Sequence, residues 1–344
     1  MVRRWLATSV VVLAGLAGAA ADASARGTIV IYSEWLADCD DCTPSGGVDL
    51  AVQTASGSFR NLYRLERRLG AGFVVGPLKS RLFVYPAIAQ DGRWIAHVTR
   101  SSGLVARRID LARQRPVGRA RRLVQFGTGD SLTAIAWSPD GRSLALGGRI
   151  QGGEGVWIVG RDGTGVRAVL CGCDPRLEQP DTRITDVAWA PGPALAVMTD
   201  SDTSGRGALY QLTPDGISLR KLSSHDPDEH EDPAWSPGGG SVAVERHRSL
   251  TRSDIVVIDA RTLISRRALT HAWGPAWSPD ASRMAFIEEG GTGTWQVGRD
   301  RIRHFRRRGP LADLDANQLA WLSARPPRVR AATAAEDQEP PPGQ

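Results

Sequence analysis

Short apolar stretches separated by polar turns recur along almost the whole chain after its first 25 residues. Five of them carry an alanine at the centre: WIAHV (94–98), SLALG (143–147), ALAVM (194–198), SVAVE (241–245) and RMAFI (283–287). Stretches of this length, bounded by Gly, Pro, Asp or Ser, are typical of β-strands joined by tight turns. The pattern predicts an all-β protein, and the recurring alanine predicts a crowded position near a common axis.

A second phrase, alanine and tryptophan followed by a turn, gives the period of the repeat. It places tryptophan at five equivalent positions, Trp137, Trp189, Trp235, Trp277 and Trp321. Ile88 fits the same frame one period earlier, which makes six copies roughly 45 residues apart, a period that indicates a propeller or a solenoid. We expect the five tryptophans to pack between neighbouring sheets as core residues.

Each repeat contains enough strands for one blade. Ser138-Pro139-Asp140-Gly141 predicts a type I turn, and the stretch GVWIVGRDGTGVRAVL (155–170) adds two strands around a second turn, so a repeat has four strands. The last copy supplies only one strand, whereas TIVIYSE (28–34), VDLAVQT (48–54) and SFRNLYRL (58–65) match the three that it lacks. We therefore expect N-terminal strands to complete the last blade and close the ring.

The phrase AWSPDGRSLAL, with VWIVGRDGTGVRAVL downstream, resembles the WD-repeat-like propeller repeats of the TolB family over about residues 28–324. The resemblance implies an all-β, six-bladed β-propeller of four-stranded blades, which we expect over residues 26–325. The α/β domain that precedes the propeller in TolB has no counterpart in the sequence, so we expect a stand-alone propeller. The repeat is used by many proteins and does not specify a function.

The two ends of the chain are expected to lie outside the propeller. MVRR, the apolar run 5–21 and Ala23-Ser24-Ala25 form the three zones of a secretory signal peptide over residues 1–25. The apolar run is shorter than the roughly 20 residues that span a bilayer, which favours cleavage over retention as an anchor. Residues 326–344 form a Pro-rich tail with too little apolar content to fold. We expect a monomer that is exported to the periplasm, the cell envelope or the medium.

The charge balance is only mildly basic, with 43 Lys and Arg against 37 Asp and Glu and a net charge of +6. Because no nucleic-acid-binding motif is present, we do not expect nucleic acid as a partner. The densest basic cluster, RDRIRHFRRRG (299–309), alternates like a strand. It is either a solvated outer strand or a patch that meets an anionic surface.

The densest polar stretch, HDPDEHED (225–232), directly precedes an inner strand, on the face that propellers commonly use for binding. The candidate binding residues are Asp186, His225, Asp226, Asp228, His230 and Asp232, and Asp186 has the same place relative to its tryptophan as Asp232. They form a solvated acidic loop, a partner site or a site for a divalent metal such as calcium. No catalytic residue is expected, since the sequence lacks a G-x-S-x-G nucleophile elbow, and it also lacks a phosphate-binding loop.

The four cysteines occur in two close pairs, Cys39 with Cys42 and Cys171 with Cys173. In an exported protein, disulfides are expected, and local pairing is the simplest arrangement. A bridge between Cys171 and Cys173 would close a small, strained and labile ring. A redox role for Cys39 and Cys42 is the alternative, without the βαβ surroundings that usually accompany it.

Two functions follow from these observations. The first is an exported, non-catalytic propeller that binds a protein or a cell-envelope ligand through one face. The alternative is a metal-dependent hydrolase or lactonase with an ion at the mouth of the channel. Ala134, Gly274 and Gln318 stand in the other repeats where Asp186 and Asp232 would have acidic counterparts, which favours the first function.

Overall fold

The computed structural model describes the chain in segments. These are residues 28–37, 45–54, 59–61, 69, 74–75, 86–99, 103–177, 182–190, 192, 194–200, 207–223, 230–249, 252–289, 291–299, 301–306 and 315–322. The predicted signal peptide (1–25) and the predicted tail (326–344) lie outside them. No helix in these segments is long and apolar enough to cross a membrane.

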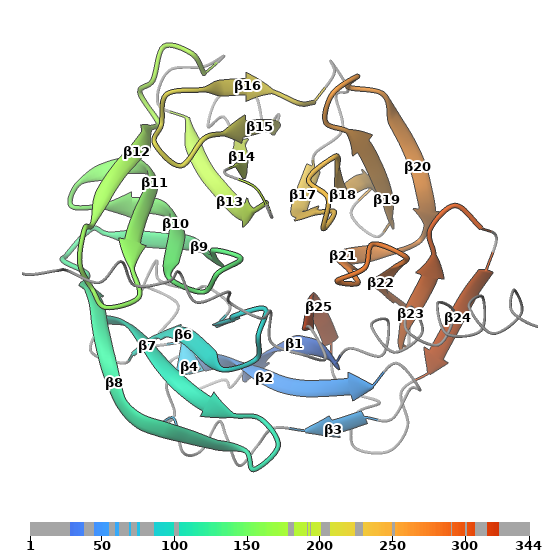
Figure 1. Cartoon of the computed structure of the whole chain (residues 1–344), viewed down its shortest axis with the longest axis horizontal. Helices are drawn as coiled ribbons and strands as arrows, with labels where there is room; N and C mark the ends of the chain where they lie inside the picture. The colour runs from blue at the N-terminus through green and yellow to red at the C-terminus, as the bar shows by residue number, and fades with distance from the viewer. Residues whose placement is uncertain are drawn as a thin grey trace, which may run out of the picture.

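The sheets are arranged radially around a central axis, with their first strands innermost and their last strands at the edge of the ring (Figure 1). The first four-stranded sheet contains β5 (Ala87–Ile88), β6 (Trp94–Val98), β7 (Gly103–Asp110) and β8 (Arg115–Gln125). The second contains β9 (Ser131–Trp137), β10 (Ser143–Ile150), β11 (Gly153–Gly160) and β12 (Arg167–Cys171). The third contains β13 (Arg183–Trp189), β14 (Leu195–Asp200), β15 (Ala208–Leu212) and β16 (Leu219–Lys221).

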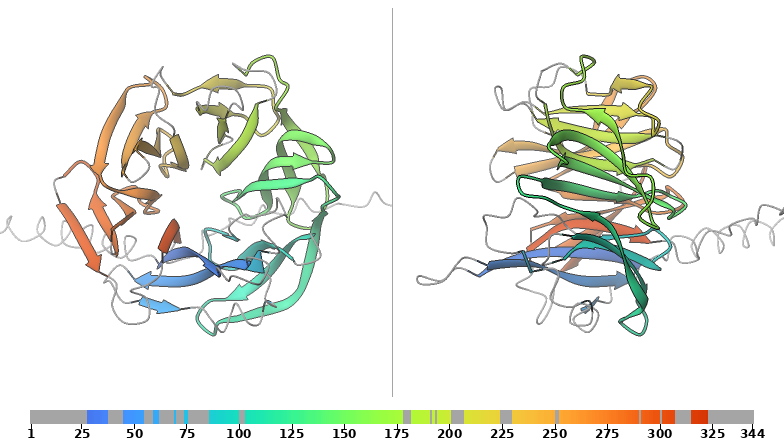
Figure 2. Two further views of the ribbon diagram at one scale, coloured as in Figure 1. Left: turned by 180° about the vertical axis from the view of Figure 1, so that it is seen from behind. Right: turned by 90° about the vertical axis from the view of Figure 1, so that its left-hand side faces the viewer.

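Two further sheets have the same composition. The fourth contains β17 (His230–Trp235), β18 (Ser241–Ser249), β19 (Arg252–Asp259) and β20 (Ser265–Thr270). The fifth contains β21 (Trp273–Trp277), β22 (Arg283–Glu288), β23 (Gly291–Gln296) and β24 (Arg301–Arg306). Neighbouring strands are antiparallel in every sheet, so each sheet is an up-and-down meander, and the two views of Figure 2 show the ring from behind and from its side.

The remaining sheet joins the two ends of the chain. It contains β1 (Thr28–Ala37), β2 (Ser45–Thr54), β3 (Phe59–Asn61), β4 (Val74–Val75) and β25 (Asp315–Leu322). The C-terminal strand β25 pairs with the N-terminal strand β1, from Leu322 opposite Thr28 to Asp315 opposite Glu34. Strands far apart in the sequence therefore share one sheet of the ring.

The structure confirms an all-β propeller but corrects the strand count. Five blades are four-stranded, not six, because the sheet at the chain ends has five strands. The reason is the unequal length of its strands. β3 pairs with Ala51–Gln53 at one end of β2, and the other end pairs with β4 through Gly46 and Gly47. Because β3 is short, part of the β2 edge has no partner in β3. Pairing with β4 provides hydrogen-bond partners for backbone groups of that part of β2.

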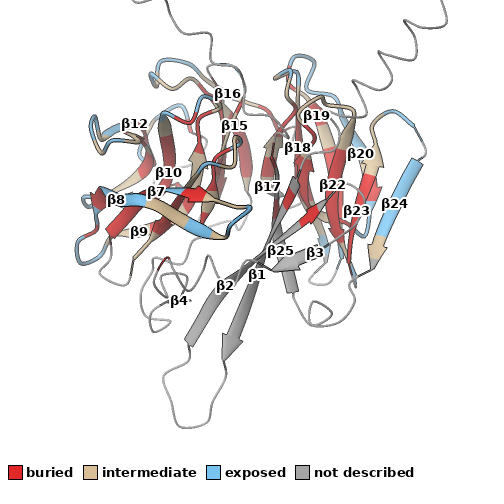
Figure 3. Ribbon diagram, turned by 60° about the horizontal axis from the view of Figure 1, so that its bottom comes forward, coloured by how far each residue is buried: buried red, intermediate tan, exposed pale blue. Residues whose placement is uncertain are grey.

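Buried residues lie mainly on the strands and exposed ones mainly in the turns (Figure 3), and the hydrophobic clusters combine residues of neighbouring sheets. Four of the central alanines, Ala96, Ala145, Ala196 and Ala243, each lie in one hydrophobic cluster with the tryptophan of the following blade. Ala96 shares a cluster with Trp137, and Ala196 shares one with Trp235. The alanine is therefore small because the next blade, with its indole, packs over it, and not because it approaches the axis.

Two of the tryptophans also link inner strands by hydrogen bonds. Trp137 Nε1 donates to the Ala87 carbonyl at 2.9 Å, and Trp277 Nε1 donates to the Ala234 carbonyl at 3.0 Å. In both cases the acceptor belongs to the inner strand of the preceding blade. The Ala-Trp motif thus contributes both apolar packing and a hydrogen bond to the contact between neighbouring blades.

The Ser-Pro-Asp-Gly turn closes on its own side chains. The Ser138 hydroxyl accepts from Ser143 N at 2.9 Å and donates to Asp140 Oδ1 at 2.6 Å, and Gly141 N donates to the Ser138 carbonyl. Partial burial raises the pKa of Asp140, but hydrogen bonds from Ser138 and Arg142 N outweigh it, so the net pKa lies below 3.8. Ser278 and Asp280 repeat the arrangement at 2.7 Å.

The second turn of the repeat packs against the outer strand of the preceding blade. Gly163 and Gly216 have φ of +87° and +81°, and a Cβ on them would lie 2.7 Å from the Arg122 carbonyl oxygen and 2.4 Å from that of Val169. Glycine is required twice over, by the left-handed backbone and by the close approach. The Asp-Gly dipeptide of the repeat is therefore an inter-blade contact.

Candidate functional site

The inner strands β9, β13, β17 and β21 all begin on one side of the ring, which we call the upper face. Because the strands alternate in direction, the turns of the β10–β11, β18–β19 and β22–β23 hairpins lie on the same face. Each of the four inner strands has a register shift near its start. Such bulges turn side chains out of the regular alternation, and they are frequent next to binding sites.

Asp186 lies in the bulge of β13, half-buried, and its Oδ1 accepts a 2.6 Å hydrogen bond from Val187 N. The preceding blade holds this strand at Ile184. Glu154 Oε1 accepts from Ile184 N at 2.9 Å, and the Thr133 hydroxyl donates to the Ile184 carbonyl at 2.8 Å. Both backbone polar groups of Ile184 are thus fixed two residues before Asp186, which restricts the position of that strand segment.

Asp232 occupies the corresponding bulge of β17, half-buried, with a φ of 48°. Aspartate is one of the few residues that adopt this left-handed conformation readily. His230 begins β17, and its backbone pairs with Arg246. The other three candidates, His225, Asp226 and Asp228, lie outside the described residues.

The β18–β19 hairpin brings a polar series beside the start of β17. His247 Nδ1 lies 3.2 Å from the Ser253 hydroxyl, and its Nε2 lies 3.6 Å from Glu245 Oε1. Glu245 is only 6% exposed, and its backbone pairs with Glu231 of β17. The predicted acidic segment and this hydroxyl–imidazole–carboxylate series therefore occupy neighbouring strands at the upper face.

The opposite side of the same hairpin carries a second buried carboxylate. Asp254 is 6% exposed. Its Oδ2 lies 3.2 Å from Arg248 Nε and 3.8 Å from an Arg267 guanidinium nitrogen, and its Oδ1 accepts from His271 N. These donors satisfy the hydrogen-bonding capacity of the buried carboxylate, and the carboxylate in turn positions the two guanidinium groups.

Sequence reasoning missed Glu245, His247, Ser253 and Asp254. The sequence feature that could have identified them is the stretch ERHRSLTRSD (245–254), in which charged residues interrupt the apolar strand pattern. A strand that is apolar at its lower end and charged at its upper end indicates that the charges gather at one face. Chemically, the cluster offers carboxylate and imidazole acceptors and guanidinium donors to a polar ligand.

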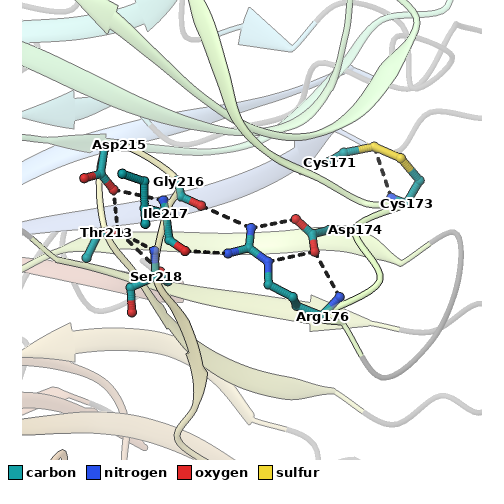
Figure 4. Close-up of polar contacts among 9 residues, drawn as sticks. All are labelled: Cys171, Cys173, Asp174, Arg176, Thr213, Asp215, Gly216, Ile217 and Ser218. Carbon is teal, nitrogen blue, oxygen red and sulfur yellow. Dashed lines mark hydrogen bonds and ion pairs between the residues drawn. A yellow bond between two sulfur atoms is a disulfide. The ribbon is translucent and has the colours of Figure 1, made fainter.

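The second cysteine pair forms a disulfide between Cys171 and Cys173, directly after the outer strand β12. Cys39 and Cys42 lie outside the described residues. Figure 4 shows the adjoining contact, in which Arg176 donates to the Ile217 carbonyl at 2.8 Å and to the Gly216 carbonyl at 3.1 Å. The side-chain hydrogen bonds from Arg176 lower the pKa of Asp174, 2.7 Å away at the closest approach. This segment joins two blades and does not belong to the upper-face cluster.

A metal site was the other prediction for the polar residues. Within the segments that the structure describes, no group of three or more His, Cys, Asp or Glu side chains could hold a metal ion. Three of the six candidate residues are outside those segments.

The comparisons with known proteins concern the fold. TolB from Acinetobacter baumannii matches with a TM-score of 0.57 at 15% identity, over 86% of this chain and 66% of that one. The propeller is similar to that of TolB. A chain of the nidogen/laminin complex matches the present chain with a TM-score of 0.57 at 9% identity, over 87% of this chain and 100% of that one. An oligogalacturonate lyase in complex with manganese matches with a TM-score of 0.50 at 10% identity, over 82% and 86%.

No protein-family model matches the sequence, and no curated protein matches it. The chain spans 66% of the length of the Acinetobacter TolB. At these identities the similarity establishes a TolB-like propeller fold and does not carry an activity with it.

Proposed function

We propose that the chain is an exported β-propeller that binds a protein or a cell-envelope ligand through its upper face, without catalysis. The signal-peptide pattern of residues 1–25 supports export. The TolB-like fold supports a rigid ring that presents loops and strand ends on one side. The mature chain is a monomer in this proposal.

The observation that carries the proposal is the concentration of ionisable side chains at the upper end of the β17–β20 blade. Asp232, Glu245, His247 and Asp254 come from three neighbouring strands, although the rest of the blade is a conventional apolar layer. Buried carboxylates oppose folding unless hydrogen bonds compensate them, so a purely structural role would be served better by apolar residues. Binding of a polar ligand accounts for the presence of these ionisable groups.

The test is capture of a partner from the native envelope by chemical crosslinking. The bait carries Asp232→Asn and His247→Gln, two nearly isosteric changes at the upper face. The matched control carries Leu263→Ser and Ile264→Ser, which are exposed in the turn on the opposite face. We expect a specific partner with the wild type and the control, and loss of it with the upper-face variant.

Two outcomes would contradict the proposal. Equal capture by the two variants would place binding elsewhere on the molecule. A bound divalent ion, together with a melting temperature that falls on chelation, would instead favour the metal-dependent hydrolase.

A further inference from the structure

The charged residues on the outermost strands of the ring are all basic. Among the strands that the structure describes, β8, β12, β16, β20 and β24 each contain at least one arginine, and none of them contains aspartate or glutamate. The basic residues on them whose side chains are described are Arg115, Arg119, Arg121, Arg122, Arg167, Arg220, Lys221, Arg266, Arg267, Arg301 and Arg303. We call this set the arginine girdle.

The rest of the molecule does not share this bias. The whole chain has 37 acidic residues against 43 basic ones, so the two signs are nearly balanced. Acidic residues occur on the inner strands, as with Asp186 and Asp232, and on the third strands, as with Glu154 and Asp254. The segregation therefore concerns the outer edge and is not a consequence of overall composition.

Most of the girdle faces solvent. Arg119, Arg121 and Arg122 are exposed on β8, and Arg301 and Arg303 are exposed on β24. Figure 3 shows β24 as one of the most exposed strands of the ring.

Acidic residues compensate part of this charge. Asp110, Asp162 and Asp215, at the turns that lead to the outer strands, interact electrostatically with Arg115, Arg121 and Arg167. Arg267 lies 3.8 Å from Asp254. Because the outer strands themselves contain basic residues and no acidic ones, a positive potential remains along the edge.

We propose that the arginine girdle binds a flexible linear polyanion, an acidic polysaccharide, along the outer edge of the ring. Guanidinium groups bind carboxylate and sulfate oxygens through paired, planar hydrogen bonds, which favours arginine over lysine at such a surface. Successive outward residues of a strand, such as Arg119 and Arg121, are about 7 Å apart, so one strand offers several contacts to a chain that runs along it.

The shape of the edge argues against the other large anions. The strands β8 and β20 lie on opposite sides of the ring (Figure 1), and a flat bilayer cannot touch both sides of a convex edge. Duplex DNA has a persistence length of about 50 nm and does not follow so tight a curve. Single-stranded nucleic acid is normally bound on a series of aromatic side chains, whereas the five outer strands contain one, Phe305 of β24, which Arg303 covers at 5.6 Å. A flexible polymer without stacking bases satisfies the geometry.

The test measures binding of fluorescently labelled polygalacturonate and heparin to the mature chain at low salt, about 10 mM, and then at about 0.15 M. The girdle variant carries Arg119→Glu, Arg266→Glu and Arg301→Glu, one on each of three outer strands. The control variant carries Arg93→Glu, Arg142→Glu and Arg261→Glu, which changes the net charge equally at exposed residues in turns. Melting curves of both variants verify that the ring is folded.

We expect the wild type to bind at least one of the two polysaccharides and to weaken as salt rises. The girdle variant should bind about tenfold more weakly or worse, and the control within about twofold of the wild type. Equal losses in the two variants, absence of binding by the wild type at low salt, or stronger binding of DNA or of phosphatidylserine vesicles would each overturn the proposal. The upper-face variant should keep polysaccharide binding, so a failure here is distinct from a failure of the proposed function.

Discussion

Replacing Gly216 by alanine tests whether the Asp-Gly turn is an inter-blade joint. The glycine lies in the turn between β15 and β16, and it packs on the β12 strand of the preceding blade. The added methyl group would lie 2.4 Å from the Val169 carbonyl oxygen, well inside the 3.4–4 Å of ordinary contact. The turn or the outer strand must therefore move.

The expected cost has two parts. A left-handed φ of +81° costs a non-glycine residue about 1–2 kcal/mol. Overpacking against backbone adds about 1–3 kcal/mol, since the turn is held on β12 by the bond from Arg167 to the Pro214 carbonyl and cannot retreat without loss. The variant should lose about 2–5 kcal/mol of unfolding free energy in total.

The matched control is Gly165→Ala, in the equivalent turn of the preceding blade. Gly165 also has a positive φ, +67°, but nothing lies within 4 Å of its hypothetical Cβ. It should lose only the backbone part, about 1–2 kcal/mol. Urea unfolding followed by tryptophan fluorescence measures both variants. Equal losses would refute the reasoning, because the contact with Val169 would then contribute nothing.

Three further predictions concern single contacts. Trp277→Phe should lose about 1–2 kcal/mol in urea unfolding because the half-buried Ala234 carbonyl of the preceding blade loses its donor. Glu154→Ala should lose a similar amount by leaving Ile184 N without its acceptor, whereas Glu154→Gln should keep most of the stability in the same assay. The Asp174 pKa lies below 3.8, mainly through hydrogen bonds from Arg176, so its contribution is present above that pH and is lost as pH falls through the lowered value. The melting temperature of Asp174→Asn should therefore lie slightly below that of the wild type at pH 6 and converge with it at about pH 2; a gap that persists at low pH would contradict the assignment.

The fold could be predicted because the residues of the inter-blade contacts recur with the period of the sequence, although a contact such as Trp137 to Ala87 spans 50 residues. Most repeats contain the tryptophan, the central alanine and the two turns, and these residues pack neighbouring blades together in the same way. The strand count at the chain ends could not be predicted. It depends on β4, whose two residues carry no periodic signal and which pairs with β2 only because β3 is short.

The binding role of the candidate residues stays a prediction, but the structure places two of them. Asp186 follows the register shift of β13 and Asp232 lies within that of β17, so both are near the start of an inner strand, as their spacing from tryptophan indicated. Glu245 and His247 were missed because strand prediction relies on apolar alternation, and a half-charged strand weakens that signal. Their proximity to Asp232 follows from the strand register, in which Glu231 lies opposite Glu245. Spacing within a repeat carries no information on that register.

Bonds between blades occur in several parts of the ring. Trp137 binds the Ala87 carbonyl at the lower face, Glu154 and Thr133 bind Ile184 at the upper face, and Arg167 binds the Pro214 carbonyl at the outer edge. The two proposed binding surfaces use other side chains, such as His247 at the upper face and Arg119 in the arginine girdle. If both proposals hold, substitution of those side chains should remove each kind of binding separately and leave the melting temperature close to that of the wild type.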